Sequence, residues 1–246
     1  MKLMASLRCF DPQAIYFITS RTVQSRYFMA PSDKMNELIG GILARTVRQC
    51  GIELFAYAFA SDHFHLMARA PSSIAMSKFM QRLRSGIGVK VGRLVEWSGG
   101  FFAGGYRAEL IAGEREQVER LVYLLSHSVS EGLMSVEWPG LSCVPSFLEG
   151  QTTSVHRWLD WSQCSKMENG RDAKIDRFSV ECPSIRESLT LTPLPGWARL
   201  TSEDRGQIIA QLAANIDRAR GSRTRKRERE RAAGRAALPQ LRAAAV

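Results

Sequence analysis

The chain lacks the cysteine patterns of two common classes of protein. It has 5 cysteines, an odd number, and none of them forms a CxxC motif. An extracellular scaffold held by disulfides needs paired cysteines, and a zinc ribbon needs closely spaced ones. The cysteine usage therefore favours a reducing compartment, and we expect a cytoplasmic protein.

Long apolar runs are also missing. No run in the sequence reaches the roughly 20 residues that a membrane-spanning helix needs, so we expect no membrane partner. The hydrophobic content of 45% is nevertheless ordinary for a folded domain. The sequence can therefore bury a core of normal size.

Positive charge is abundant but unevenly distributed. The formal net charge is +10, and the stretch from Arg218 to Val246 contributes +8 of it, from 10 basic and 2 acidic residues. Such a tail favours a polyanionic partner, most commonly nucleic acid. The plainer alternative is a solvated tail that only keeps the protein in solution. We predict DNA contacts in this tail for Arg223, Arg225, Lys226 and Arg227.

Periodic patterns predict the element order strand, helix, strand, strand, helix, strand, helix in the first part of the chain. The expected strands cover residues 14–20, 52–59, 63–69 and 106–111, and the helices start near Asp33, Ser73 and Gly113. This order is typical of an α+β fold with a ferredoxin-like antiparallel sheet and helices on one face.

The same patterns suggest three regions. Residues 1–150 are expected to form the main domain. Residues 151–217 are expected to be an irregular and helical extension that packs on this domain or is linked to it, with a last helix starting near Ser202. Residues 218–246 are expected to be a basic, disordered tail.

Two histidines flank one phenylalanine in the expected strand 63–69. Because side chains alternate along a strand, His63 and His65 should share one face, while Phe64 points into the core. Two imidazoles on one face can bind one divalent ion. Many strands carry two histidines by chance, so this pair needs support from elsewhere in the chain.

The third expected helix provides that support. Its apolar stripe consists of Val118, Leu121, Val122, Leu125 and Val129. This stripe leaves Tyr123 and His127 on another face, and their spacing of four residues places them one turn apart. Taken alone, Tyr123 could be a surface tyrosine, and His127 a histidine that interacts with the helix C-terminus. The chain has only 4 histidines, however, and three of them lie in these two motifs. The fourth, His156, is assigned to ordinary surface.

Three imidazoles and one phenol fit a specific reaction. A divalent ion held by His63, His65 and His127 would polarise a phosphodiester, and the Tyr123 hydroxyl would attack its phosphorus. Phenolate leaves more readily than an alkoxide, so a DNA 3′-hydroxyl can reverse the phosphotyrosine bond. This chemistry suits strand transfer better than plain hydrolysis.

These residues resemble a known family. The triplet His63-Phe64-His65, the helix that carries Tyr123 and His127, and the turn Trp138-Pro139-Gly140 are similar to the single-tyrosine HUH transposases. These are the IS200-like family, and the resemblance is to its REP-associated tyrosine transposase branch. It covers roughly residues 12–150. Relatives usually carry Asn or Gln where this chain has His127; all three can ligate a metal, although His127 would favour later transition metals.

The resemblance implies an enzyme that depends on Mg²⁺ or Mn²⁺ and cleaves single-stranded DNA near a hairpin. The products would be a 5′-phosphotyrosine and a free 3′-hydroxyl, which later rejoin. Basic residues of the second helix and the fourth strand would contact DNA phosphates, which set affinity and position rather than sequence. These residues are Lys78, Arg82, Arg84, Lys90, Arg93 and Arg107.

Two alternatives stay open at this point. One is a domesticated relative that binds hairpin DNA or RNA without cutting it, and the other is an unrelated metalloenzyme in which Tyr123 is incidental. The sequence is compatible with a monomer or a homodimer. It leaves open whether Tyr123 serves the histidines of its own chain or those of a partner chain.

Overall fold

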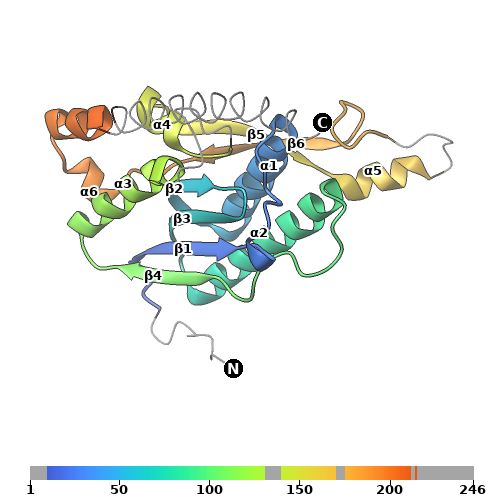
Figure 1. Cartoon of the computed structure of the whole chain (residues 1–246), viewed down its shortest axis with the longest axis horizontal. Coiled ribbons are helices and arrows are strands. Elements are labelled where there is room, and N and C mark those ends of the chain that lie inside the picture. The colour runs from blue at the N-terminus through green and yellow to red at the C-terminus, as the bar shows by residue number, and fades with distance from the viewer. Residues whose placement is uncertain (1–9, 131–139, 170–174, 212–213, 215–246) are drawn as a thin grey trace, which may run out of the picture. The chain divides into compact units, whose positions relative to one another are not determined.

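The computed structural model describes residues 10–130, 140–169, 175–211 and 214 (Figure 1). The chain divides into two compact units. The first unit combines residues 1–125 with 139–200, and the second combines 126–138 with 201–246. The sheets and the predicted histidine pair all belong to the first unit.

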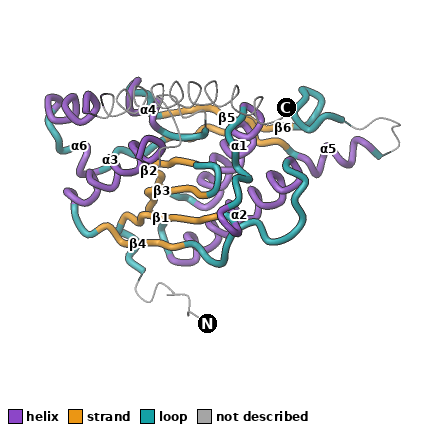
Figure 2. Tube along the Cα trace, in the orientation of Figure 1, coloured by secondary structure: helices purple, strands orange, loops and turns teal. Residues whose placement is uncertain are grey.

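The main sheet has four antiparallel strands in the order β2-β3-β1-β4 (Figure 2). Its strands are β1 (Ile15–Arg21), β2 (Glu53–Phe59), β3 (His63–Arg69) and β4 (Arg107–Ile111). The first and third strands lie in the centre, as in a ferredoxin-like sheet. The predicted fold class is confirmed, and each strand lies within about two residues of its predicted range.

Serine caps define the starts of the two long helices. In α1 (Asp33–Cys50) the Ser32 hydroxyl accepts a hydrogen bond from the Met35 amide at 3.1 Å, and in α2 (Ser73–Leu94) Ser72 does the same for Ala75 at 3.1 Å. Such caps satisfy amides that have no partner within the helix. Helix α1 ends at Gly51, whose φ of +61° is the left-handed conformation typical of a helix end.

The two faces of the sheet differ in composition. Tyr16, Ile18, Phe64 and Leu66 are fully buried on one face, and α1 and α2 contribute further fully buried apolar side chains. The opposite face carries the histidines. Near it lies α3 (Glu114–Ser130), which buries leucines in its first four turns.

A small second sheet follows the main one in sequence. Strands β5 (Thr153–Leu159) and β6 (Ser184–Thr190) pair antiparallel, and three short helices accompany them. These helices are α4 (Val144–Glu149), α5 (Trp161–Glu168) and α6 (Pro195–Ala198). The expectation of irregular structure was wrong for β5 and β6. Their alternation is weak because both strands carry charged residues, and a long stretch separates the two partners.

The second sheet packs against α1 at a pair of glycines. A Cβ atom on Gly41 would lie 2.0 Å from the Arg157 carbonyl oxygen, and one on Gly40 would lie 2.3 Å from the His156 ring. Only glycine permits such a close approach of β5 to a helix. The assignment of His156 to the surface was therefore wrong, and burial lowers the pKa of this histidine.

The second unit includes a helix over residues 202–211. Thr201 caps it, because its hydroxyl accepts a hydrogen bond from the Asp204 amide at 3.0 Å. This agrees with the predicted start near Ser202. The tail 218–246, with its four predicted DNA contacts, lies outside the described residues. In the part of the chain that is described, no helix is long and apolar enough to cross a membrane.

Candidate active site

The two histidines of the predicted pair lie at the start of β3, directly after a tight turn. The Ala60 amide donates a hydrogen bond to the His63 carbonyl at 2.8 Å, which closes the turn through Ser61 and Asp62. The rings of His63 and His65 are buried, and their centroids lie 5.0 Å apart. The rings therefore share one face of the sheet, as the strand periodicity predicts.

Each imidazole is held through its Nδ1 atom. In His63 this atom lies 2.5 Å from Oδ1 of Asp62, and in His65 it lies 2.9 Å from the Thr19 hydroxyl. A partner on Nδ1 fixes the orientation of the ring and assigns the ligand role to Nε2, as is usual for histidines that bind metals. The donor set therefore fits two ligands of a divalent ion.

Asp62 and Thr19 are site residues that the sequence reasoning missed. Asp62 is buried and directly precedes the first histidine, and Thr19 lies opposite His65 in the β1–β3 ladder. The available signal for Thr19 was the alternation of side chains along the expected strand 14–20, which places every second residue on the face of the sheet that carries the histidines. The register that pairs Thr19 with His65 depends on the folded sheet.

Tyr123 lies beside the histidine pair. Its ring centroid is 5.8 Å from that of His65 and 6.0 Å from that of Phe17, and 42% of the residue is exposed. Buried Leu121 and Leu125 anchor this part of α3, as the predicted stripe requires. Leu124, which the predicted stripe omits, is buried as well. The tyrosine thus combines contact with the histidine face and access from solvent.

The third predicted ligand cannot be placed in the same way. Residue 127 belongs to α3, but the His127 side chain lies outside the described part of the structure. Among the side chains that are described, no group of three or more His, Cys, Asp or Glu could hold a metal ion. His63 and His65 alone fit a metal here, and the ligand role of His127 stays a prediction.

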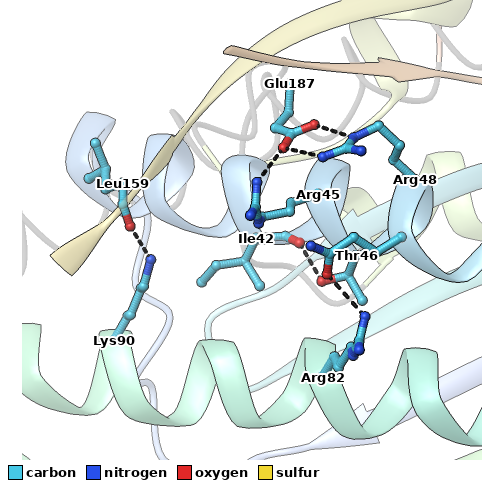
Figure 3. Close-up of polar contacts among 9 residues, drawn as sticks. Ile42, Arg45, Thr46, Arg48, Arg82, Lys90, Leu159 and Glu187 are labelled. Atoms are coloured by element: carbon cyan, nitrogen blue, oxygen red, sulfur yellow. Dashed lines mark hydrogen bonds and ion pairs between the residues drawn. The ribbon is translucent and has the colours of Figure 1, made fainter. Parts of the chain in front are cut away.

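Two of the predicted DNA contacts make interactions within the fold. The Lys90 ammonium donates to the Leu159 carbonyl (Figure 3). It also lies 4.5 Å from the centroid of the Trp158 ring. Burial lowers the pKa of this lysine to about 8. Arg84 donates to the Gly104 carbonyl. Lys90 thus joins α2 to β5, and Arg84 joins α2 to the loop before β4.

The other predicted cations of the main domain lie at the surface. Lys78, Arg82 and Arg93 are exposed along α2. Arg107 pairs with Thr19 in the β1–β4 ladder, so it shares the face of the histidines, and it forms an ion pair with Glu109 at 2.6 Å. The structure therefore brings Arg107 to the histidine face, while the α2 cations lie on a different element.

Residues 16–122 match the model of a family described as "Transposase IS200 like". Residues 16–122 are therefore similar to the IS200-like transposases. The matched segment begins in β1, contains both histidines of β3 and ends one residue before Tyr123. The family resemblance that the motifs suggested is thereby confirmed.

Two solved structures are similar to parts of this chain. One is a REP-associated tyrosine transposase bound to a REP hairpin, with 13% identity over 60% of this chain and 86% of that chain, at a TM-score of 0.48. The other is a proposed transposase from Deinococcus radiodurans R1, with 18% identity over 48% of this chain and 95% of that chain, at a TM-score of 0.33. The comparison with curated proteins gives no match.

Proposed function

We propose that this protein is a metal-dependent transposase and single-stranded DNA endonuclease that cleaves and rejoins DNA through a 5′-phosphotyrosine. The observation that carries the proposal is the position of Tyr123, whose ring lies 5.8 Å from that of His65, on the face where the two histidines meet. A nucleophile next to a pair of oriented imidazoles is the arrangement that this chemistry needs.

The residues have separate roles in the proposed reaction. Mg²⁺ or Mn²⁺, held by His63, His65 and His127, would supply positive charge that polarises the phosphate. Asp62 keeps the His63 ring in one orientation. The Tyr123 oxygen loses its proton and forms a bond to phosphorus, the bond from phosphorus to O3′ breaks, and O3′ takes up a proton. The reverse sequence rejoins the strand.

The proposed substrate is single-stranded DNA that bears a hairpin. The partly exposed Tyr123 can meet a polymeric substrate, and Arg107 on the same face of the sheet adds a phosphate-binding group. A hairpin is the ligand of the REP-associated transposase described above. The proposed place of action is the cytoplasm, as monomer or homodimer.

A covalent trapping experiment tests the proposal. The protein is incubated with Mn²⁺ and a labelled library of single strands that carry stem-loops, and denaturing gels then report protein–DNA adducts. We expect an adduct that is lost in Tyr123→Phe and kept in Tyr106→Phe, a matched variant at a tyrosine outside the site. Specific binding without an adduct under any divalent metal would favour the domesticated binding protein. Neither binding nor adduct would overturn both proposals.

A further inference from the structure

The loop after β1 presents basic and aromatic side chains that the proposed reaction does not use. The short helix η1 (Val23–Ser25) lies in this loop, Arg21 ends β1 before it, and Tyr27 follows it. The Arg21 side chain is 53% exposed, and Tyr27 is 68% exposed. Exposed arginines and exposed aromatic rings are the two kinds of side chain that sites for single-stranded nucleic acids combine.

Backbone hydrogen bonds fix this loop to the turn that precedes the histidines. The Thr22 amide donates to the Asp62 carbonyl at 2.7 Å, and the Met29 amide donates to the Ser61 carbonyl at 2.8 Å. A third bond, from the Val23 amide to the Phe101 carbonyl at 2.9 Å, holds the other side of the loop. The loop therefore has a defined position relative to His63 and its neighbours.

Arg21 lies directly across from His63 in the β1–β3 ladder, so the two residues share one face of the sheet. Its Nη1 atom is 3.6 Å from Oδ2 of Asp62, the carboxylate that orients His63. A guanidinium carries five N–H donors and binds phosphate oxygens in pairs. Because half of the side chain is exposed, donors of Arg21 can reach a phosphate next to the histidine pair.

The neighbours of Tyr27 in this loop pack on an aromatic side chain, while Tyr27 itself is exposed to solvent. The Arg26 guanidinium lies 4.5 Å from the centroid of the Trp97 ring, and the Phe28 ring lies 4.9 Å from it. The side chains on both sides of Tyr27 therefore pack on one tryptophan. Tyr27 itself presents its ring to solvent on a loop that is already ordered.

We propose that Arg21 and Tyr27 form a subsite for the single strand that flanks the phosphate attacked by Tyr123. Arg21 binds a backbone phosphate, and the ring of Tyr27 stacks on a base. The subsite selects single strands, because the bases of a duplex are stacked on each other and offer no free face at this position. This inference rests on the proposed function, since both concern the same DNA strand.

Binding to labelled single-stranded oligonucleotides, measured by fluorescence anisotropy at several salt concentrations, tests the subsite. EDTA is present, so that no cleavage interferes. We expect Arg21→Gln to reduce the slope of log K against log salt by about 0.7, the contribution of one phosphate contact. Arg186→Gln, which alters an exposed arginine on β6, should leave this slope unchanged.

The stacking role has a different signature. Tyr27→Ala should weaken binding of single strands about 5- to 150-fold, which corresponds to the loss of one base–aromatic stack, with no change in salt slope. Tyr27→Phe keeps the ring and should bind like the unaltered protein. The affinity for a blunt duplex should be the same in the unaltered protein, in Tyr27→Ala and in Tyr27→Phe.

The outcomes separate this inference from the proposed function. The subsite is overturned if Arg21→Gln leaves the salt slope unchanged and Tyr27→Ala leaves the affinity for single strands unchanged. This holds even if the Tyr123 adduct forms. Failure of the unaltered protein to bind single strands overturns it as well. If both variants weaken binding as expected but no adduct forms under any metal, the subsite stands and the proposed cleavage is wrong.

Discussion

Glu187 on β6 provides a quantitative test of how the second sheet is attached to α1. The residue is only 3% exposed. Its carboxylate accepts hydrogen bonds from Nη1 of Arg45 at 2.8 Å, and from Nε and Nη2 of Arg48 at 2.7 and 2.9 Å (Figure 3). One buried charge on β6 thus engages two arginines of α1.

Substitution of Glu187 by Gln keeps the shape of the side chain and removes its charge. Loss of one partner of a buried ion pair costs about 3–5 kcal/mol of unfolding free energy. Arg48 is largely exposed and can be solvated again, so the lower end applies, about 3 kcal/mol. For a chain of this size each kcal/mol shifts Tm by about 2–4 °C, so we expect a decrease of about 6–12 °C.

Thermal unfolding followed by circular dichroism at pH 7 measures this decrease. Glu181→Gln, at an exposed glutamate shortly before β6, is the matched control and should change Tm by less than about 2 °C. Amide hydrogen exchange adds a local readout: exchange in β5 and β6 should accelerate in the Glu187 variant, while β1 and β3 keep their protection. A Tm for Glu187→Gln within about 2 °C of the unaltered protein would refute the reasoning.

The difference in Tm between the unaltered protein and Glu187→Gln should depend on pH in a defined direction. Hydrogen bonds from Arg48, with a smaller contribution from Arg45, lower the pKa of Glu187. A carboxylate whose pKa is lowered by folding stabilises the protein fully above the ordinary glutamate pKa of about 4.3. This stabilisation is lost as the pH falls through the lower pKa of the folded state. The difference in Tm between the two proteins should therefore shrink in acid.

Three further substitutions test other contacts. Gly41→Ala should lower Tm in the same assay by several degrees, although alanine favours helices, because its Cβ would lie 2.0 Å from the Arg157 carbonyl oxygen; an unchanged Tm would mean that β5 can move away. Lys90→Met tests a pKa that burial lowers to about 8, from an ordinary value of about 10.4. Between about pH 8 and about pH 10.4 the unfolded chain binds more protons than the folded one, so the free energy of unfolding rises with pH in this range. Urea unfolding at pH 7 and at pH 10 should therefore show that the unaltered protein becomes more stable relative to Lys90→Met at the higher pH. Asp62→Asn should weaken Mn²⁺ binding about 10- to 100-fold in calorimetry, because the carboxylate no longer orients His63; equal titrations would remove Asp62 from the site.

Local signals explain which parts of the fold were predictable. The serine caps at Ser32 and Ser72 and the glycine at residue 51 mark helix boundaries through bonds to near neighbours, so the sequence contains them directly. The common face of His63 and His65 follows from the two-residue period of a strand. Both features are local and need no knowledge of the tertiary structure.

Contacts between distant segments were not predictable in this way. The pairing of Thr19 with His65 depends on the register of β1 against β3, which no local pattern specifies. The pairing of β5 with β6 depends on a segment that folds back across a long connection. The hydrogen bond from Lys90 to the Leu159 carbonyl depends on the tertiary position of β5. A lysine on a polar helix face has the same local pattern whether it binds DNA or a carbonyl oxygen.

The glycine pair in α1 has a consequence for reading related sequences. Gly40 and Gly41 weaken a helix, and the structure accounts for them only through the backbone and side chains of β5 that lie against them. A transposase domain that lacks this second sheet has no such neighbour, and larger residues would fit there and strengthen the helix. Adjacent glycines in the middle of the first helix can therefore serve as a sequence marker for domains that carry this second sheet. Good helix formers at both positions would mark domains that lack it.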